Sequence, residues 1–206
     1  MVYGDLVSRL VQPPRRLIVA LTGASGTIFG VRLLQMLRGT GIETHLVMSR
    51  WAARTLLHET TYTPEQVQGL ADVVHPLTDQ AAPISSGSFI TMGMVVAPCS
   101  ARTLAAIAHG VGDNLIHRAA DVVLKERRKL VLAVRESPLS EIHLENMLKL
   151  SRMGVVIAPP LPAFYARPQS IDDMVDYSAA RMLDQLGIHV ETERWTGEMV
   201  PGTVER

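Results

Sequence analysis

Short apolar runs alternate along the chain with longer segments of helical periodicity, and this alternation constrains the fold more than any other feature. The predicted strands are Leu17–Leu21, Thr44–Met48, a weaker Val73–His75, Met94–Ala97, Leu130–Val134 and Val155–Ala158. The predicted helices are Thr27–Arg38, Arg50–His58, Pro64–Ala71, Arg102–His109, Leu115–Arg127, Glu141–Arg152 and Ile171–Leu186. Continuously apolar strands between helices are typical of a parallel sheet that is covered on both faces. The sequence therefore predicts a three-layer α/β fold, with helices on both faces of a parallel sheet.

The length, composition and net charge of the chain limit the class of protein to which it can belong. Its 206 residues are 47% apolar and 19% charged, which suits one folded domain with a sizeable core. Lys plus Arg and Asp plus Glu both number 20, so the net charge is zero and bulk electrostatics do not favour nucleic acid or an acidic membrane as a partner. No apolar run approaches the roughly 20 residues that a membrane helix needs, so we expect no membrane span.

The cysteine content and the chain ends add three expectations. Cys99 is the only cysteine, so no internal disulfide can form, and no Cys/His cluster has the spacing of metal ligands. We therefore expect a metal-free protein of the reducing cytoplasm. Residues 1–15 contain charges and Pro13-Pro14 but no signal-peptide core, so we expect a short N-terminal extension. The folded domain is expected to span 16–195, with a C-terminal tail over 196–206.

The first predicted strand runs directly into the turn Thr22-Gly23-Ala24-Ser25-Gly26, after which a helical pattern begins. A helix N-terminus behind a tight turn of small residues is a usual place to hold a phosphate. The dinucleotide pattern G-x-G-x-x-G fails, because Ser25 and Ile28 stand where its second and third glycines belong. A Walker motif is absent as well. The turn therefore suits a mononucleotide phosphate or another small phosphate ester, to which Ser25 can donate a hydrogen bond.

Polar residues also follow other predicted strands. These exits hold Ser49, then Ser100-Ala101-Arg102-Thr103, then Arg135-Glu136. Ligands of open α/β sheets bind beyond the carboxyl ends of the strands, so we expect these residues to gather at one site. The alternative for each serine is that it only caps the following helix. The Arg–Glu pair after an apolar strand favours a functional role, since burying charge is costly without a partner or a task.

Further charged and aromatic side chains are candidates for a site. Arg118, Asp121 and Lys125 share one helix face, either as a solvated ion-pair ladder or as a grip on a phosphate. Glu59 ends a helical pattern, where a carboxylate opposes the helix dipole, and this mild violation is a hint of function. Tyr165 and Arg181 are further candidates, which would bring a phenol and a guanidinium to a site.

A second glycine-rich stretch, APISSGSF over Ala82–Phe89, precedes the predicted strand Met94–Ala97. Glycine at this place allows the backbone to come close to a flat ligand. The alternative, an ordinary surface loop, is favoured by the segment taken alone.

Longer stretches of the sequence resemble the UbiX/Pad flavin prenyltransferases. They are TGASGTIFGVRLLQML, ISSGSF, PCSARTLAAIAHG, RAADVVLKERRKLVLAVRESPLS, IHLENMLKLSRMG and PPLPAFYARPQSIDDMVD, in the order of that family. The resemblance runs from about Arg16 to Trp195, and the LKERR and FYARPQS segments are its specific parts.

The resemblance implies a Rossmann/flavodoxin-like sheet in a homo-oligomer, commonly a dodecamer of trimers, with sites at subunit interfaces. It implies binding of reduced FMN and dimethylallyl phosphate, and transfer of the dimethylallyl group to the flavin, first to the central-ring nitrogen and then to a benzenoid carbon. Phosphate leaves, no metal is required, and the product is prenylated FMN. The implied recipient of this product is a UbiD-type decarboxylase.

The resemblance also implies roles for individual residues. The implied FMN-binding residues are Gly23, Ala24, Ser25, Ser49, Ser100, Ala101, Arg102, Thr103 and Arg135. The implied ligands of dimethylallyl phosphate are Lys125, Tyr165 and Arg181, with Arg118 in the matching stretch. The implied catalytic residues are Ser25, Glu59, Lys125 and Glu136. Ring closure needs a base, and Glu59, Glu136 and the released phosphate are the alternatives.

Two other functions fit parts of this sequence. One is a flavin-dependent cysteine decarboxylase of similar fold, although RESPLSEIHLENM stands where those proteins carry an Asn/Met-rich segment. The other is a non-catalytic FMN carrier. Lys125, Glu136, Tyr165 and Arg181 together argue against a carrier, since FMN storage does not need all of them. The sequence does not decide between the monophosphate and the pyrophosphate ester as the donor of the dimethylallyl group.

Overall fold

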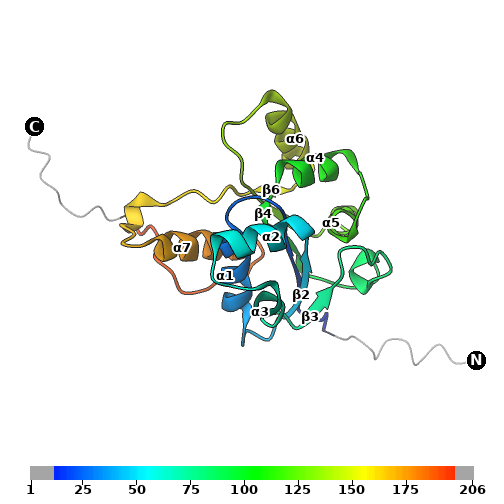
Figure 1. Ribbon diagram of the computed structural model, residues 1–206, viewed down its shortest axis with the longest axis horizontal. Helices are drawn as coiled ribbons and strands as arrows, with labels where there is room; N and C mark the ends of the chain where they lie inside the picture. Colours follow the sequence, from blue (N-terminus) through cyan, green and yellow to red (C-terminus); the bar gives the residue numbers. More distant parts are fainter. Residues whose placement is uncertain (1–11, 198–206) are drawn as a thin grey trace, which may run out of the picture.

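A six-stranded, fully parallel sheet forms the centre of the molecule (Figure 1). The computed structural model describes residues 12–197. The strands are β1 (Arg16–Leu21), β2 (Glu43–Met48), β3 (Val73–His75), β4 (Gly93–Cys99), β5 (Lys129–Val134) and β6 (Val156–Ile157). Their order across the sheet is β3-β2-β1-β4-β5-β6.

Helices cover both faces of this sheet. The α-helices are α1 (Thr27–Leu37), α2 (Arg50–Glu59), α3 (Pro64–Gln68), α4 (Ala101–His109), α5 (Leu115–Lys125), α6 (Glu141–Arg152) and α7 (Ile171–Asp184). Two short 3₁₀ turns are η1 (Pro83–Ser85) and η2 (Phe164–Ala166). One apolar core lies between the sheet and α1, α2, α3 and α7, and a second lies under α4, α5 and α6 (Figure 1). The predicted three-layer α/β fold is thus confirmed.

The central strand β1 shows why the apolar runs are continuous. Leu17, Val19 and Leu21 point into the first core, and Ile18 and Ala20 point into the second. All of these side chains are almost completely buried. Burying one large aliphatic side chain contributes roughly 1.5–3 kcal/mol, so both faces of the strand favour the same three-layer arrangement.

The order in which strands are added to the sheet changes side at β1. The segments that follow β1 build β2 and β3 on one side of it, and the later strands β4, β5 and β6 are added on the other side. The connections on the two sides pack against opposite faces of the sheet. Sheets of this kind bind their ligands beyond the carboxyl ends of the two strands at which the order reverses, which are β1 and β4 here.

The observed bounds differ from the predicted ones by one to three residues at most elements, and three of these differences have a structural reason. β4 continues beyond the predicted end at Ala97 to Cys99, through Pro98, and the Ala97–Pro98 peptide is cis. The helix predicted over Pro64–Ala71 ends at Gln68, because Gly69 forms its C-cap. β6 keeps only two residues of the predicted strand, since it pairs on one side only, with β5.

Both chain ends reach beyond the described part of the molecule. Of the predicted N-terminal extension, residues 1–11 lie outside the described residues, and of the predicted tail, 198–206 do. Between residues 12 and 197, no helix combines the length and the apolar character that crossing a membrane requires.

Candidate active site

Thr22, the first residue after β1, ties the end of this strand to the end of β4. Its hydroxyl donates to the carbonyl of Pro98 at 2.8 Å and accepts the backbone N–H of Ser100 at 2.8 Å. Its own backbone N–H donates to the Pro98 carbonyl at 3.2 Å. The side chain is buried, so these bonds are shielded from water. They hold the turn after β1 and the loop after β4 side by side.

The loops after β2 and β5 join the same edge. The backbone N–H of Ser49 donates to the carbonyl of Leu21 at 2.9 Å, and that of Arg135 donates to the carbonyl of Cys99 at 3.1 Å. The strand exits that carry the predicted FMN-binding residues therefore form one continuous edge of the sheet.

The two serines at this edge are helix N-caps. Ser49 Oγ accepts the N–H of Ala52 at 3.0 Å, and Ser100 Oγ accepts the N–H of Thr103 at 3.3 Å. Ser100 also donates its hydroxyl hydrogen to Thr103 Oγ1 at 3.1 Å. In the described part of the chain, Ser49 Oγ makes no second hydrogen bond, so its hydrogen can be donated to a ligand. Capping does not exclude binding, because the N–H groups of each first helical turn still face the edge.

The N-terminus of α1 already holds an anion, and this anion is the side chain of Glu59. Its Oε2 accepts the N–H of Gly26 at 2.8 Å and both the N–H and the hydroxyl of Thr27 at 3.3 Å. The Ser25 hydroxyl is a further hydrogen-bond partner of this carboxylate. Gly26 has a φ of 95°, a left-handed conformation that glycine adopts most easily and that turns its N–H toward the carboxylate.

These contacts set the charge of Glu59. Partial burial works to raise the pKa of its carboxyl group, but the hydrogen bonds from Ser25, Gly26 and Thr27 outweigh burial and hold the pKa below its ordinary value. Glu59 is the last residue of α2, where it opposes the dipole of its own helix. The structure accounts for this violation, because the carboxylate is bound by the positive end of the neighbouring helix α1.

The predicted turn residues Gly23 and Ala24 lie between the end of β1 and the start of α1. A Cβ atom on Gly23 would come within 2.4 Å of Cβ of Trp51, so any side chain at this position would collide with α2. The N–H of Ala24 donates to the carbonyl of Thr22 at 2.9 Å, which closes the turn. Glycine is therefore required here for close packing of the turn against α2.

The charged side chains of the edge reach into solvent. Arg135 and Glu136 are both exposed directly after the buried end of β5. Arg102 is 79% exposed and lies 3.8 Å from the nearest carboxylate oxygen of Asp113, a distance at which a surface ion pair contributes little. These groups are available to a ligand rather than engaged in the core.

Lys125 lies at the opposite edge of the sheet. It is the last residue of α5, and Lys129, soon after it, pairs with Gly93 at the beginning of β4. Ser100 follows the other end of β4. The 7 residues of this strand, at roughly 3.3 Å each, put about 20 Å between the two places. Within one chain, Lys125 is therefore remote from the residues at the carboxyl edge.

Arg118 belongs to the same helix as Lys125, and the predicted charged ladder is formed only in part. The Arg118 guanidinium donates to Asp121 at 2.7 Å and to the carbonyl of Ser85 at 3.2 Å. Lys125 is not part of this ladder, because its Nζ pairs with the carboxylate of Glu126 at 2.6 Å.

Tyr165 and Arg181 meet at a third place, beside α7. Both line a cavity of about 310 Å³ together with Trp195. The Tyr165 hydroxyl lies 2.5 Å from that of Tyr177, and Arg181 pairs with Asp184 at 2.6 Å. The structure thus brings these two predicted ligands together, but places them apart from Lys125 and Arg118 in the same chain.

Sequence reasoning missed the residues that hold the site in shape. Thr22 and Trp51 contact the predicted residues directly, and Glu126 binds Lys125. The position of Thr22, between an apolar strand and a glycine turn, was a usable signal. The contacts of Trp51 and Glu126 depend on tertiary structure and leave no local pattern.

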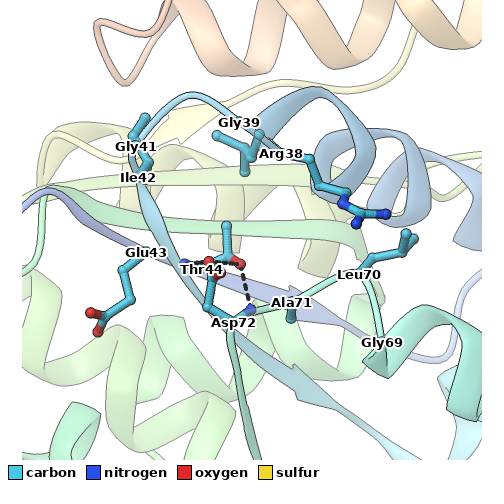
Figure 2. A pocket seen from close by; sticks show the side chains of 11 residues that line it. Arg38, Gly39, Gly41, Ile42, Glu43, Thr44, Gly69, Leu70, Ala71 and Asp72 are labelled. Carbon is cyan, nitrogen blue, oxygen red and sulfur yellow. Dashed lines mark hydrogen bonds between the residues drawn. The ribbon is translucent and has the colours of Figure 1, made fainter.

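The cavity in Figure 2 does not belong to this site. It measures about 520 Å³ and lies at the amino edge of the sheet, between the end of α1 and the loop after α3. Its main polar feature is Asp72, which accepts the N–H and the hydroxyl of Thr44 at 2.7 and 2.8 Å. These groups satisfy one another and brace β2 against the entry to β3. Among residues 12–197, no group of three or more His, Cys, Asp or Glu side chains is placed to hold a metal ion.

The carboxyl edge fits a mononucleotide. The N-termini of α2 and α4 meet there, and helix N-termini bind phosphate through their N–H groups and their dipole. Ser49 adds a hydroxyl donor and Arg135 an exposed guanidinium on the same edge. The fold and this edge together define a flavodoxin-like protein with a mononucleotide-type site at its topological switch point.

Sequence comparison places the chain in a named family. The family model described as Flavoprotein matches residues 8–183. The chain is 56% identical over 187 residues to the flavin prenyltransferase UbiX of Escherichia coli (strain K12), covering 89% of this chain and 99% of that protein. The chain therefore belongs to the UbiX-like flavin prenyltransferases, as predicted.

Solved structures agree with this assignment. The crystal structure of AnUbiX (PadA1) in complex with FMN and dimethylallyl pyrophosphate matches with a TM-score of 0.88 at 55% identity, over 90% of this chain and 99% of that chain. A dodecameric FMN-dependent UbiX-like decarboxylase from Escherichia coli O157:H7 matches with a TM-score of 0.87 at 58% identity, over 88% of this chain and 100% of that chain. The flavodoxin-like fold is thus confirmed.

Proposed function

We propose that this protein transfers the dimethylallyl group of dimethylallyl phosphate to reduced FMN and releases prenylated FMN and phosphate. The observation that carries the proposal is the carboxyl edge of the sheet, in a chain of the UbiX-like family. There the starts of α2 and α4 are tied to the end of β1, and Glu59 binds the start of α1. A flavin prenyltransferase needs such an edge to seat FMN next to a group that can handle protons.

Residues of this edge are assigned to FMN. The proposed FMN-binding residues are Gly23, Ala24, Ser25, Ser49, Ser100, Ala101, Arg102, Thr103 and Arg135. The N–H groups at the starts of α2 and α4 suit its phosphate and ribityl oxygens. Bound reduced FMN supplies the electron-rich ring that receives the dimethylallyl group. Gly23 keeps the turn close to α2, so the edge stays open for the flavin.

The remaining predicted residues act on the ester. Phosphate leaves readily only when its charge is neutralised, so we assign Lys125 and Arg181 to stabilise its departure, with Arg118 and Tyr165 as further ligands. The allylic C–O bond breaks with its electron pair on the phosphate, and we assign Ser25 to donate a hydrogen bond to it, with its hydroxyl hydrogen turned from Glu59 to the phosphate. Ring closure releases a proton from the flavin carbon, and Glu136 at the same edge is our candidate to accept it.

This assignment requires a second copy of the chain. Lys125 lies about 20 Å from the carboxyl edge of its own chain, by the length of β4. It lines a groove of about 730 Å³, and the charged residues of this groove are Arg118, Asp121, Lys125, Arg127, Lys149 and Arg152. The excess of positive charge suits an anionic ligand held by a neighbouring copy. We therefore propose a homo-oligomer with shared sites, and a dodecamer in keeping with the dodecameric relative.

The donor, the recipient and the location belong to the same proposal. The relative AnUbiX (PadA1) was crystallised with the pyrophosphate ester, so both esters need to be compared as donors. A UbiD-type decarboxylase is the proposed recipient of prenylated FMN. The cytoplasm is the proposed location, and the domain is proposed to span 16–195. Co-expression with a UbiD-type enzyme tests the recipient, and cell fractionation tests the location.

An anaerobic reaction of the purified protein with reduced FMN and dimethylallyl phosphate tests the function. We expect phosphate release and, by mass spectrometry, a flavin heavier by one five-carbon unit. FMN that stays unmodified while both compounds are bound would show a carrier instead. Carbon dioxide released from a peptidyl or pantothenoyl cysteine would show a decarboxylase.

A further inference from the structure

A partly buried arginine, three residues after Lys125, binds the glycine-rich loop that precedes β4. Arg128 donates from Nη2 to the carbonyl of Gly87 at 2.6 Å and from Nη1 to the carbonyl of Phe89 at 2.8 Å. Its side chain is only 15% exposed. We call residues 85–91 the clamped loop, because Arg118 holds the other end of it through the carbonyl of Ser85 at 3.2 Å.

The clamped loop in turn packs against Lys125. A Cβ atom on Gly87 would lie 2.8 Å from Nζ of Lys125 and 2.1 Å from Oε1 of Glu126, so the loop backbone lies directly against this ion pair. Glycine at 87 thus allows a close approach to the end of α5, which neither the flat-ligand nor the surface-loop interpretation of this segment predicts.

The local backbone explains how Arg128 reaches the loop. Arg127 adopts a left-handed conformation with a φ of 57° and ends the helical course of α5. The chain turns there, and the Arg128 guanidinium reaches the loop carbonyls, while the Lys125 side chain is about half exposed. The carboxylate of Glu126 lies 2.6 Å from Lys125 and 4.0 Å from Arg128, so it links the two cations.

A guanidinium holds the two carbonyls of the clamped loop better than an ammonium group would. Its planar fork donates several hydrogen bonds in fixed directions, whereas a lysine offers one rotating point charge. Two carbonyls held by one buried fork fix both the position and the tilt of the loop. Because the loop backbone is in contact with the Lys125–Glu126 pair, fixing the loop also limits where the Lys125 ammonium can lie.

We propose that Arg128 is a positioning residue for Lys125: through the clamped loop, it holds the Lys125 ammonium where the phosphate of the prenyl donor is bound. The role of Lys125 in this statement rests on the proposed function. Arg128 touches neither substrate in this scheme, and its effect reaches the reaction only through the loop. A misplacement of about 1 Å in a reacting group can lower a rate roughly 100-fold, so such support matters for catalysis.

The lysine content of the chain allows a direct test that does not depend on activity. Lys125, Lys129 and Lys149 are its lysines, so reductive ¹³C-methylation gives few NMR signals, and Lys125→Arg assigns the one of interest. Methylation keeps the positive charge. We expect Arg128→Gln to move the Lys125 signal toward that of a free lysine and to leave Lys129 and Lys149 unchanged. Arg127→Gln, which removes a neighbouring charge without touching the loop, is the control and should leave all of them in place.

Kinetics then separate positioning from general damage. Arg128→Gln is expected to raise KM for dimethylallyl phosphate and to lower kcat/KM roughly 10- to 100-fold, with KM for FMN within twofold of the parent protein. Arg128→Lys keeps the positive charge but loses the planar fork, so its kcat/KM should lie between those of Arg128→Gln and the parent protein. An unmoved Lys125 signal with an unchanged KM for the donor overturns the proposal.

Gly87→Ala provides the same test without removing a hydrogen bond, and it decides the matter if Arg128→Gln does not fold. The added methyl group is expected to push the Lys125–Glu126 pair aside and to raise KM for the donor. A Lys125 signal that stays in place in this variant counts against the proposal. If the parent protein transfers no dimethylallyl group, the proposed function fails, and the Lys125 signal still decides whether the clamped loop positions this lysine.

Discussion

The carboxylate of Glu59 accepts a 2.8 Å hydrogen bond from the backbone N–H of Gly26, a residue 33 positions earlier in the chain. The last residue of α2 thereby caps the first turn of α1. The turn after β1 is predicted to hold a phosphate, and in the structure the carboxylate of Glu59 accepts the N–H groups of Gly26 and Thr27 at this helix start. We predict that Glu59, which contacts Ser25, receives or returns a proton as phosphate leaves.

Replacing Glu59 by glutamine tests the effect of this contact on stability and on phosphate release. The neutral amide is a weaker acceptor at a helix N-terminus, so the free energy of unfolding should fall by about 1 kcal/mol at pH 7. Phosphate release should slow by roughly 100-fold if Glu59 handles a proton. Denaturant titration and a phosphate assay measure the two effects, and Glu145→Gln, on an exposed face of α6, serves as the control.

The stability effect of Glu59 should also depend on pH in a defined direction. Its pKa is lowered in the folded state, so its carboxylate stabilises the fold above the ordinary glutamate pKa of about 4.3, and this contribution is lost as the pH falls through the lowered value. The stability difference between the parent protein and Glu59→Gln should therefore shrink as the pH is lowered from 7 toward 3. A difference that persists unchanged at that pH would contradict the hydrogen-bonded carboxylate.

The remote position of Lys125 predicts complementation between inactive variants. Lys125→Ala should keep FMN binding but lose turnover, and Ser25→Ala should do the same from the carboxyl edge. If one copy supplies Lys125 to the edge of another, random co-assembly of equal amounts restores about one site in four. Activity of co-expressed, differently tagged chains measures this recovery.

A matched mixture controls the complementation. Lys125 and Arg118 lie on the same helix, so one copy contributes both. Co-assembly of Lys125→Ala with Arg118→Ala should therefore restore nothing, since each shared site lacks one of the two cations. Equal recovery in both mixtures, or none in either, argues against the shared site.

The sequence was sufficient to predict which residues lie at the carboxyl edge of the sheet, because that edge is determined by the order of strands and helices along the chain. Continuous apolar runs separated by helices define a parallel sheet, and the residues at the carboxyl ends of such strands must lie on one edge. Ser49 and Ser100 were therefore placed correctly, although their capping bonds were one of two open alternatives. The same topology also implies that Lys125, which ends the helix before β5, lies at the other edge.

The contacts between distant segments were beyond prediction from local patterns. The pairing of Glu59 with Gly26 depends on how α2 lies against α1, and the sequence shows only that a carboxylate ends a helix. The contact of Gly87 with Lys125 likewise depends on the packing of a loop against α5. Propensity and spacing describe each segment by itself, whereas these contacts are set by tertiary packing.

Cys99 should be unreactive in the folded protein despite its place at the end of β4. Burial raises the pKa of its thiol to about 12, so almost no thiolate is present near neutral pH, and the side chain is inaccessible. We expect labelling by a thiol reagent at pH 8 to be at least about 1,000-fold slower than for the unfolded chain. Mass spectrometry of iodoacetamide-treated protein, with and without denaturant, measures this ratio, and rapid labelling of the native protein would show that β4 opens at its end.

Two buried histidines form a hydrogen-bonded chain under the loop that leads to β4. His45 Nδ1 lies 2.9 Å from His75 Nε2, and His45 Nε2 lies 2.7 Å from the carboxylate of Glu43. Arg16 pairs with the same carboxylate at 3.0 Å. Because a single proton can lie between the facing ring nitrogens, both imidazoles cannot be charged while this bond is intact. Burial, followed by the charge of His45, lowers the pKa of His75, and Asp79 opposes this shift.

This histidine pair predicts loss of stability in mild acid. Because the folded-state pKa of His75 lies below the unfolded value of about 6.5, the unfolded chain binds the proton more readily, so stability is full above that pH and declines as the pH falls through the lowered value. Between pH 7 and pH 5 we expect Tm to drop by about 2–4 °C more in the parent protein than in His75→Gln, which keeps a hydrogen-bonding group without titrating. Thermal unfolding followed by circular dichroism measures the difference, with the exposed His58→Gln as the control. A parent protein and His75→Gln with parallel pH profiles would show that the pair does not titrate in this range.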